Sequence, residues 1–342
     1  MNAREASGAL TNEKDRRTTA RTCERTLYNK AFRVMGGWGL VRFVDDRGLA
    51  AAEALARRAM DEAERIERKY SRFLETSLVA RINRAAGRTS VAVDAETLLL
   101  VEKALDLARR TGGAFDPTVG VLRRAWRWRE KHVPLQSELD ALLPLVDHRA
   151  VAVSHGTVML ARAGMELDLG GVGKEYAVDR VARLLDEDGV ESAIVNLSGD
   201  VACVRARGDG RPWRIGVLDP RDRQRCRFSV RLACGGGIAS SGDYERFFVV
   251  DGCRYHHLLD ARTGWPARGV AGTTVVAASA FEAGLAATAA FLLGPRDGLR
   301  YLEDAGGIEG ALFTEDGVLQ ATSGLLRCSD LPGSWYAAHP EI

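Results

Sequence analysis

The feature that most constrains the fold is a change of pattern near residue 150. Beyond it, short runs of β-branched and apolar residues alternate with Gly and Asp turns, as in strands joined by short links. The predicted strands cover 150–153, 157–161, 165–168, 192–197, 200–206, 227–233 and 246–250. A single helix, at 172–187, interrupts them. Grouped strands beside segregated helices predict an α+β fold, with mixed and antiparallel sheets flanked by helices, and not a doubly wound sheet.

Before this change, most apolar residues fall at helical spacing. The stretch 49–73 predicts a long amphipathic helix. A second helix is predicted at 95–111, with Asp94 as its N-cap and a Gly-Gly pair after its last turn. We interpret 117–147, which carries two tryptophans, as helical too.

The two ends of the folded region predict strands. A strand, a tight turn at Met35 and a second strand are expected over 31–44. Towards the other end, a strand at 273–278 leads into an alanine-rich helix at 280–293, and a last strand pair falls around 310–321.

Length and composition indicate an ordinary globular protein. The chain has 342 residues, of which 46% are apolar and 27% charged, so it can bury the core of one large domain. The net charge of +2 gives no reason to expect nucleic-acid binding. Residues 1–26 are polar and are expected to form a disordered tail, followed by one domain over 27–342.

The sequence also predicts a cytoplasmic location. The six cysteines include no CxxC pair and no metal-binding spacing, which favours a reducing compartment. The N-terminus lacks the apolar segment of a secretory signal. No run of about 18 apolar residues is present to insert into a membrane.

A glycine-rich turn is the first candidate site. Asp168 ends a predicted strand, Gly170, Gly171 and Gly173 follow, and Lys174 falls in the first turn of the next helix. Free N–H groups at a helix start bind anions, and a bound phosphate would explain a lysine at this end of the helix dipole. A tight strand-to-helix turn with a solvated lysine explains the same residues without a ligand.

Two adjacent histidines form the second candidate. His256 and His257 follow the stretch Ser240-Ser-Gly-Asp243, and neighbouring strand residues face opposite sides. One can therefore face a cleft and take a proton from a hydroxyl near neutral pH. A purely structural histidine is the alternative. A third stretch, Gly112 to Gly120, is explained by Asp116 as a helix cap and Pro117 at the first helical position.

Taken in order, these stretches resemble one family. They are Gly113-Ala-Phe-Asp-Pro-Thr-Val-Gly, Asp168-Leu-Gly-Gly-x-x-Lys, Asn196-Leu-Ser-Gly-Asp200, Ser241-Gly-Asp-Tyr-Glu-Arg-Phe-Phe, Tyr255-His-His-Leu-Leu-Asp and Thr263-Gly-Trp-Pro. The chain resembles the FAD:protein FMN transferases of the ApbE family from about residue 31 to 325. Several long motifs in the family's order are far more specific than one glycine loop.

The resemblance implies a T-fold-like unit that binds FAD in a cleft and transfers FMN to a Thr or Ser hydroxyl of an acceptor flavoprotein, releasing AMP. It places His257 as the base that activates the hydroxyl. The implied FAD-binding residues are Met35, Tyr70, Ala114, Phe115, Asp116, Asp168, Gly170, Gly171, Lys174, Ser241, Gly242 and Asp243. The implied partners are FAD and the acceptor, with no nucleic acid and no membrane insertion.

The chain departs from the family at the magnesium site. The resemblance implies that Thr288 and the Gly173 carbonyl bind the metal, but Gly284 stands where the family has an aspartate. Glu175 also stands where glycine is usual. The nearest carboxylate on that helix, Glu282, is turned by roughly 200° from residue 284. A magnesium site weakened in this way predicts reduced or altered catalysis, and Gly284→Asp is expected to raise magnesium-dependent activity.

Two further interpretations therefore stay open. One is a catalytically impaired flavin-binding paralogue that binds or delivers FAD, or regulates a partner. The other is hydrolysis of FAD to FMN and AMP, which needs the same metal.

Overall fold

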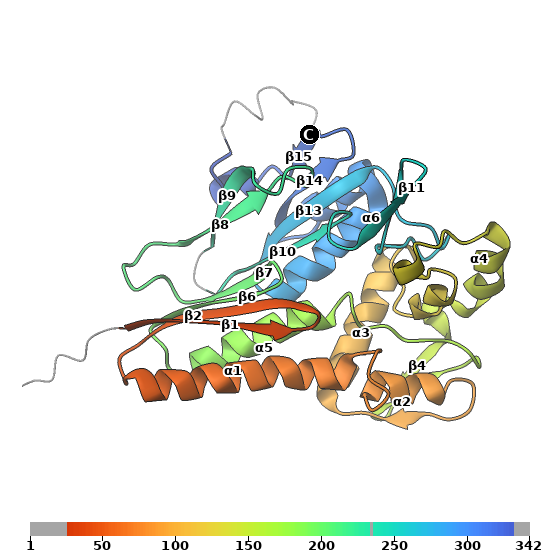
Figure 1. Cartoon of the computed structure of the whole chain (residues 1–342), viewed down its shortest axis with the longest axis horizontal. Coiled ribbons are helices and arrows are strands. Elements are labelled where there is room, and N and C mark those ends of the chain that lie inside the picture. The colour runs from red at the N-terminus through yellow and green to blue at the C-terminus, as the bar shows by residue number, and fades with distance from the viewer. Residues whose placement is uncertain (1–25, 233–234, 332–342) are drawn as a thin grey trace, which may run out of the picture.

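The computed structural model describes residues 26–232 and 235–331. The predicted tail lies almost entirely outside these residues. The fold contains an eight-stranded sheet, and each of its strand pairs is antiparallel (Figure 1). In spatial order, its strands are β1 (Thr26–Val34), β2 (Gly37–Asp45), β6 (Ser192–Leu197), β7 (Asp200–Val204), β10 (Gly237–Gly242), β13 (Val270–Ala277), β14 (Glu309–Thr314) and β15 (Leu319–Ala321).

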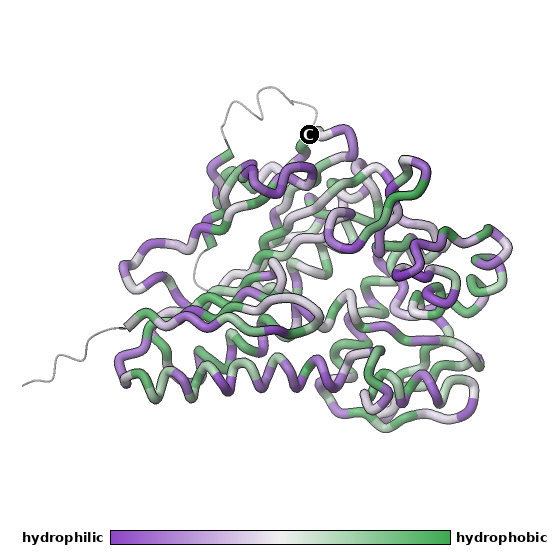
Figure 2. The backbone as a smooth tube through the Cα atoms, in the orientation of Figure 1, coloured by the Kyte–Doolittle hydropathy of each residue, from purple (hydrophilic) through white to green (hydrophobic). Residues whose placement is uncertain are grey.

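Three helices cover one face of this sheet. α1 (Leu49–Tyr70) packs on α5 (Gly173–Glu187), α5 packs on β6 and β7, and α6 (Ala280–Asp304) packs on β10, β13 and β14. The apolar stripe of α1, from Ala52 to Ile66, is buried, and hydrophobic and hydrophilic residues alternate along this helix (Figure 2). α6 is broken at Gly294, whose φ of +86° no other residue adopts easily, so its first segment matches the predicted helix.

The other face carries a separate apolar cluster. The hairpin of β8 (Trp213–Leu218) and β9 (Cys226–Leu232) supplies Val217, Phe228 and Val230 to it. The central sheet supplies Val201 and Phe313. Two small sheets complete the fold, one formed by β11 (Phe247–Val250) and β12 (Cys253–His256), and the other by β3 (Val91–Ala92), β5 (Thr157–Leu160) and β4 (Val151–Ser154).

The helices α2 (Leu78–Arg84), α3 (Ala95–Arg110) and α4 (Gln136–Leu142) lie beside this main unit. α3 begins as predicted, because the Asp94 carboxylate accepts the Thr97 N–H at 3.0 Å. No helix in the described residues is long and apolar enough to cross a bilayer.

The helical interpretation of 117–147 is wrong over most of its length. Apart from α4 the segment forms short 3₁₀ turns, and Pro134 and Pro144 interrupt it. Trp126 is buried and stacks on Trp128 with ring centroids 5.3 Å apart. Its indole N–H donates to the Gly264 carbonyl at 2.8 Å. Trp126 also packs on Phe248 and Tyr255 of the β11–β12 hairpin, and this packing decides the conformation here.

The predicted strand at 165–168 is also wrong. This stretch forms one isolated parallel bridge, between Glu166 and Val119, and the Asp168 N–H donates to the Pro117 carbonyl at 2.7 Å. An extended segment without a neighbouring strand on either side remains a loop.

Candidate active site

The glycine turn is shaped by the first residue of its motif. Asp168 accepts the Gly170 N–H at 2.9 Å through one carboxylate oxygen, and Arg72 pairs with the other. Gly171 lies against the Phe115 ring, since a Cβ there would stand 3.2 Å from a ring carbon. The turn then enters α5 at Gly173, whose N–H donates to the Leu169 carbonyl at 2.8 Å. Asp168 thus organises the turn, and its charge is already neutralised.

Lys174 has a protein partner, which the sequence did not reveal. Its ammonium pairs with Asp200, a buried residue at the start of β7. Burial opposes its charged form, but the charges of Asp200 and Glu175 prevail and raise the pKa of Lys174. The interpretation of a merely solvated lysine is therefore wrong. A bound phosphate is not required to explain the residue, although the side chain keeps 27% of its exposure.

Glu175 is the functional candidate that reasoning from the sequence missed. The residue is only 7% exposed, and its carboxyl lies beside Lys174 and near Asp200. Burial, followed by the negative charge of Asp200, raises the pKa of Glu175 to about 7. The one signal in the sequence was its occurrence where the family usually has glycine.

Ser241 and Thr288 lie together. Ser241 belongs to β10 and Thr288 to α6, and their hydroxyl oxygens are 3.1 Å apart. Thr288 is buried, and Gly284 precedes it by one helical turn on the same face. Glu282 is exposed because α6 is regular over this region, so it does not reach this place.

The two histidines face opposite ways, as predicted. His256 is buried at the end of β12, donates to the Ala267 carbonyl at 2.9 Å and meets the Phe291 ring edge-on. His257 is partly exposed, and its Nδ1 lies 3.3 Å from the Arg246 carbonyl. Loss of solvation lowers the pKa of His257 to about 4, assisted by the positive charges of Arg246 and Lys174. A neutral imidazole is therefore available at neutral pH.

The buried His256 makes a testable contribution to acid stability. Burial lowers its pKa from 6.5 to about 4, so between these values the unfolded chain binds a proton that the folded chain does not. Stability is therefore lost as the pH falls from 6.5 towards 4, by about 2 kcal/mol between pH 7 and pH 5. His256→Gln keeps a donor for the Ala267 carbonyl and should reduce this pH dependence by that amount in urea unfolding measurements. An unchanged pH dependence would show that His256 does not titrate in this range.

The resemblance implies that Asp243 and Asp116 bind FAD, but both carboxylates already have partners within the protein. Asp243 is buried and forms a two-pronged ion pair with Arg221, at 2.6 and 2.8 Å. Asp116 is buried and accepts two hydrogen bonds each from Thr118 and His148. No α-helix follows Asp116, so the predicted helix cap is wrong, and the residue shapes a loop.

The neighbouring implied residues join the same region. Ala114 is buried, and its carbonyl accepts the Ala261 N–H at 3.0 Å, which ties this loop to the segment after His257. Gly242 ends β10 against the Tyr244 ring, where a Cβ would approach a ring carbon to 2.1 Å. Replacing this glycine would displace the ring.

Met35 and Tyr70 occupy different surroundings. Met35 has a φ of +52° in the β1–β2 turn. A Cβ at the adjacent Gly36 would lie 3.9 Å from the Arg246 guanidinium, so the turn approaches the segment that holds His257. The Tyr70 hydroxyl lies between α1 and α3, 3.1 Å from Thr97 Oγ1. That tyrosine therefore links helices.

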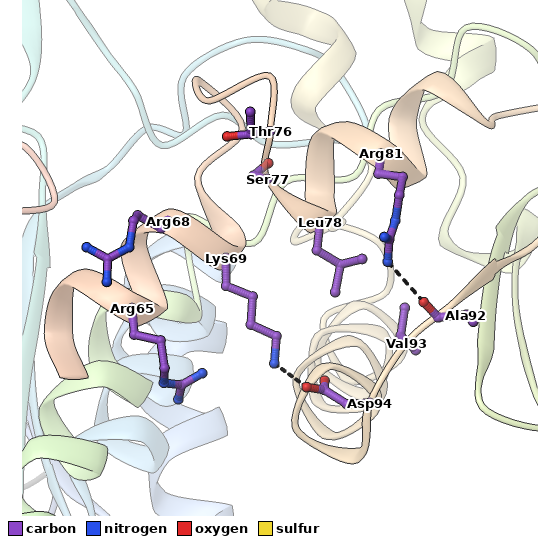
Figure 3. A pocket seen from close by; sticks show the side chains of 10 residues that line it. All are labelled: Arg65, Arg68, Lys69, Thr76, Ser77, Leu78, Arg81, Ala92, Val93 and Asp94. Atoms are coloured by element: carbon purple, nitrogen blue, oxygen red, sulfur yellow. Dashed lines mark hydrogen bonds and ion pairs between the residues drawn. The ribbon is translucent and has the colours of Figure 1, made fainter. Parts of the chain in front are cut away.

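A hollow of about 690 Å³ lies elsewhere, between the end of α1 and α2 (Figure 3). Its lining is basic, but Lys69 pairs with Asp94 and Glu96, and Arg65 pairs with Glu62 and Glu96. Neither the glycine turn nor His257 lines it. The predicted FAD cleft is therefore not this hollow, and its position stays a prediction.

Comparison with known sequences decides the family. The profile of the ApbE family matches residues 35–312, most of the described chain. The chain belongs to the ApbE family. A relative from Treponema pallidum, named FAD:protein FMN transferase, is 31% identical over 317 residues, which cover 87% of this chain and 88% of that protein.

Solved ApbE structures have the same fold. The ApbE protein of Thermotoga maritima matches with a TM-score of 0.81 and 34% identity, over 89% of this chain and 99% of that one. The flavin transferase ApbE of Vibrio cholerae matches with a TM-score of 0.80 and 27% identity, over the same shares. The predicted α+β class and the family resemblance are confirmed.

Proposed function

We propose that this protein is an enzyme that transfers the FMN half of FAD to a hydroxyl of an acceptor flavoprotein and releases AMP. One observation carries the proposal: in a chain of the ApbE family, the neutral His257 lies close enough to Lys174, in the first turn of α5, for that ammonium to lower its pKa. The relatives' name, FAD:protein FMN transferase, supports the same activity.

The residues divide the chemistry between them. In the proposed reaction the acceptor hydroxyl oxygen attacks the phosphorus of the FMN half, and the bond from that phosphorus to the oxygen bridging to AMP breaks. The hydroxyl proton passes to His257, and AMP leaves with its phosphate. Lys174 and the positive end of the α5 dipole would favour the pyrophosphate, which suits a reaction that depends mainly on positioning and charge neutralisation.

Magnesium is part of the proposal. When bound, it would neutralise charge on the pyrophosphate. The described residues contain no group of three or more His, Cys, Asp or Glu side chains that could hold a metal alone. Magnesium usually takes one or two carboxylates together with substrate phosphates, and the hydroxyl of Thr288 and the carbonyl of Gly173 are further oxygen donors.

A cytoplasmic location and a Thr or Ser target hydroxyl are also proposed. Three cysteines in the described residues, Cys226, Cys253 and Cys328, form no disulfide, which supports a reducing compartment.

An impaired flavin-binding role remains the second candidate, because Gly284 removes the expected carboxylate from α6. In that case the protein would bind FAD without turning it over.

The test is incubation of the full chain with FAD and magnesium, with and without lysate of its host. We expect AMP to appear by chromatography only when lysate is present, together with flavin that stays on protein through denaturation. Omission of FAD is the control. Bound FAD with no AMP under any divalent metal would contradict the proposal and favour the second candidate.

A further inference from the structure

Glu175 and Gly284 occupy each other's space where α5 meets α6. A Cβ built on Gly284 would lie 2.2 Å from Glu175 Cγ and 3.0 Å from its Cδ, well inside van der Waals contact. The Glu175 side chain therefore fills the volume that any side chain at residue 284 would need. Only one of the two positions can carry a side chain in this packing.

The Glu175 carboxyl is buried without enough partners. Its Oε2 atom has no hydrogen-bond partner and almost no solvent access, and its Oε1 atom lies 3.8 Å from the Lys174 ammonium. An oxygen that is both buried and unpartnered is costly, because it has lost water and gained nothing in return. Such an atom indicates a partner that the chain itself does not supply.

The surroundings of this carboxyl specify the chemistry of that partner. The negative charge of Asp200 acts on this carboxyl more strongly than the positive charge of Lys174 does, so the place disfavours a further anion. Thr288 lies one helical turn beyond Gly284 and adds a hydroxyl, and Gly173 adds a backbone carbonyl at the start of α5. The donors are oxygen atoms, which suit a hard divalent cation and not a soft metal.

We propose that Glu175 is the anionic protein ligand of a divalent cation, magnesium in the cell, bound between α5 and α6. This inference deepens the proposed function and rests on it, because the FAD pyrophosphate would complete the coordination. The carboxylate that α6 lacks at Gly284 is supplied from α5. The site is therefore rearranged, and the expectation of a weakened site does not follow from Gly284 alone.

The first experiment measures binding of Mn²⁺ to the full chain with FAD present, by the electron paramagnetic resonance signal of free Mn²⁺. Glu175→Gln keeps the shape of the side chain and removes its charge, and we expect the Mn²⁺ affinity to fall by roughly 10- to 100-fold. Glu282→Gln is the matched control, since it removes the same charge from the exposed face of α6 and should leave the affinity within about twofold. Equal affinities in the wild type and Glu175→Gln would overturn the proposal.

A second readout does not depend on turnover. Without metal, Glu175→Gln should melt no lower than the wild type, because the substitution removes the cost of burying a charged carboxylate. The rise in Tm that Mn²⁺ produces in the wild type should be lost. A rise of equal size in both proteins would place the cation elsewhere.

Exchanging the two positions gives the strictest test. Gly284→Asp alone should lower the Tm and fail to strengthen Mn²⁺ binding, because Glu175 fills the space. The structure therefore replaces the earlier expectation that Gly284→Asp raises magnesium-dependent activity. Combined with Glu175→Gly, the aspartate has room, and Mn²⁺ affinity should return to within about fivefold of the wild type. Glycine is needed at 175 because the Glu175 Cβ lies 3.1 Å from the position that a Cβ on residue 284 would take. A double variant no better than Glu175→Gly would contradict the rearrangement.

The outcomes separate the two proposals. Loss of Mn²⁺ binding in Glu175→Gln beside a wild type that releases no AMP would support the cation site and refute the transferase. AMP release by the wild type, together with a Mn²⁺ affinity that Glu175→Gln leaves unchanged, would support the transferase and refute the cation site.

Discussion

His257→Asn is expected to lower the rate of FMN transfer by roughly 10²- to 10⁴-fold while FAD still binds. The imidazole of His257 is partly exposed, neutral at pH 7 and held at the Arg246 carbonyl. Asparagine can keep a hydrogen bond to that carbonyl but cannot take the acceptor's proton. Single-turnover flavinylation and FAD titration by flavin fluorescence would measure the two effects separately.

His256→Gln is the matched control, because it changes the adjacent residue on the opposite side of the strand. At pH 7 we expect it to transfer FMN within a few fold of the wild type. If His257→Asn loses FAD binding in parallel with transfer, the histidine has a structural role and the assignment as base is wrong.

The pH profile gives an independent check of the same role. A lowered pKa leaves His257 unprotonated, and able to accept a proton, at every pH well above about 4. At saturating magnesium, which by the proposal above keeps Glu175 ionised, the acid limb of kcat/KM should therefore lie well below the 6.5 of an ordinary histidine, and the profile should stay flat between about pH 5.5 and 7.5. A limb near 6.5 would show that the base is another group, or that His257 is solvated.

Elements with strong local signals were predictable from the sequence. α1, α3 and α5 have buried stripes at helical spacing, and Asp94 caps α3 as expected. β8 and β10 were missed. β10 is Gly237–Gly242, in which every residue except Ile238 is small, so it lacks the alternation that marks a strand. It is fixed by pairing with β13 over its whole length.

Some residues of the candidate site were likewise predictable from the sequence, and others were not. The motifs located His257 and the glycine turn, because their order in the chain matches a family. The partnership of Lys174 with Asp200, and the contact of Glu175 with Gly284, join residues far apart in sequence that no periodicity connects. Two unusual residues were visible separately, but only the packing of α5 against α6 shows that one fills the space left by the other.

The same packing logic predicts that the loss of Asp116 should cost much stability. The Asp116 carboxylate is buried and satisfies four donors, namely the N–H and hydroxyl of Thr118 and the N–H and ring nitrogen of His148, at 2.6 to 2.9 Å. Asp116→Ala leaves the buried Thr118 donors and the partly buried His148 donors without this acceptor. We expect the free energy of unfolding to fall by about 3–5 kcal/mol in urea titrations.

Asp106→Ala provides the comparison, since the Asp106 side chain on α3 is 49% exposed and its ion pair is with Arg109 at 3.3 Å. Its loss should change stability by less than about 0.5 kcal/mol.

The resemblance placed Asp116 among the FAD-binding residues, and the structural role and the FAD-binding role predict different results. If Asp116 is structural, its substitution lowers stability equally with and without FAD. If Asp116 binds FAD, its substitution also reduces the stabilisation that FAD gives. If Asp116→Ala keeps the wild-type stability but loses FAD affinity, the carboxylate acts on the ligand and the loop does not depend on it.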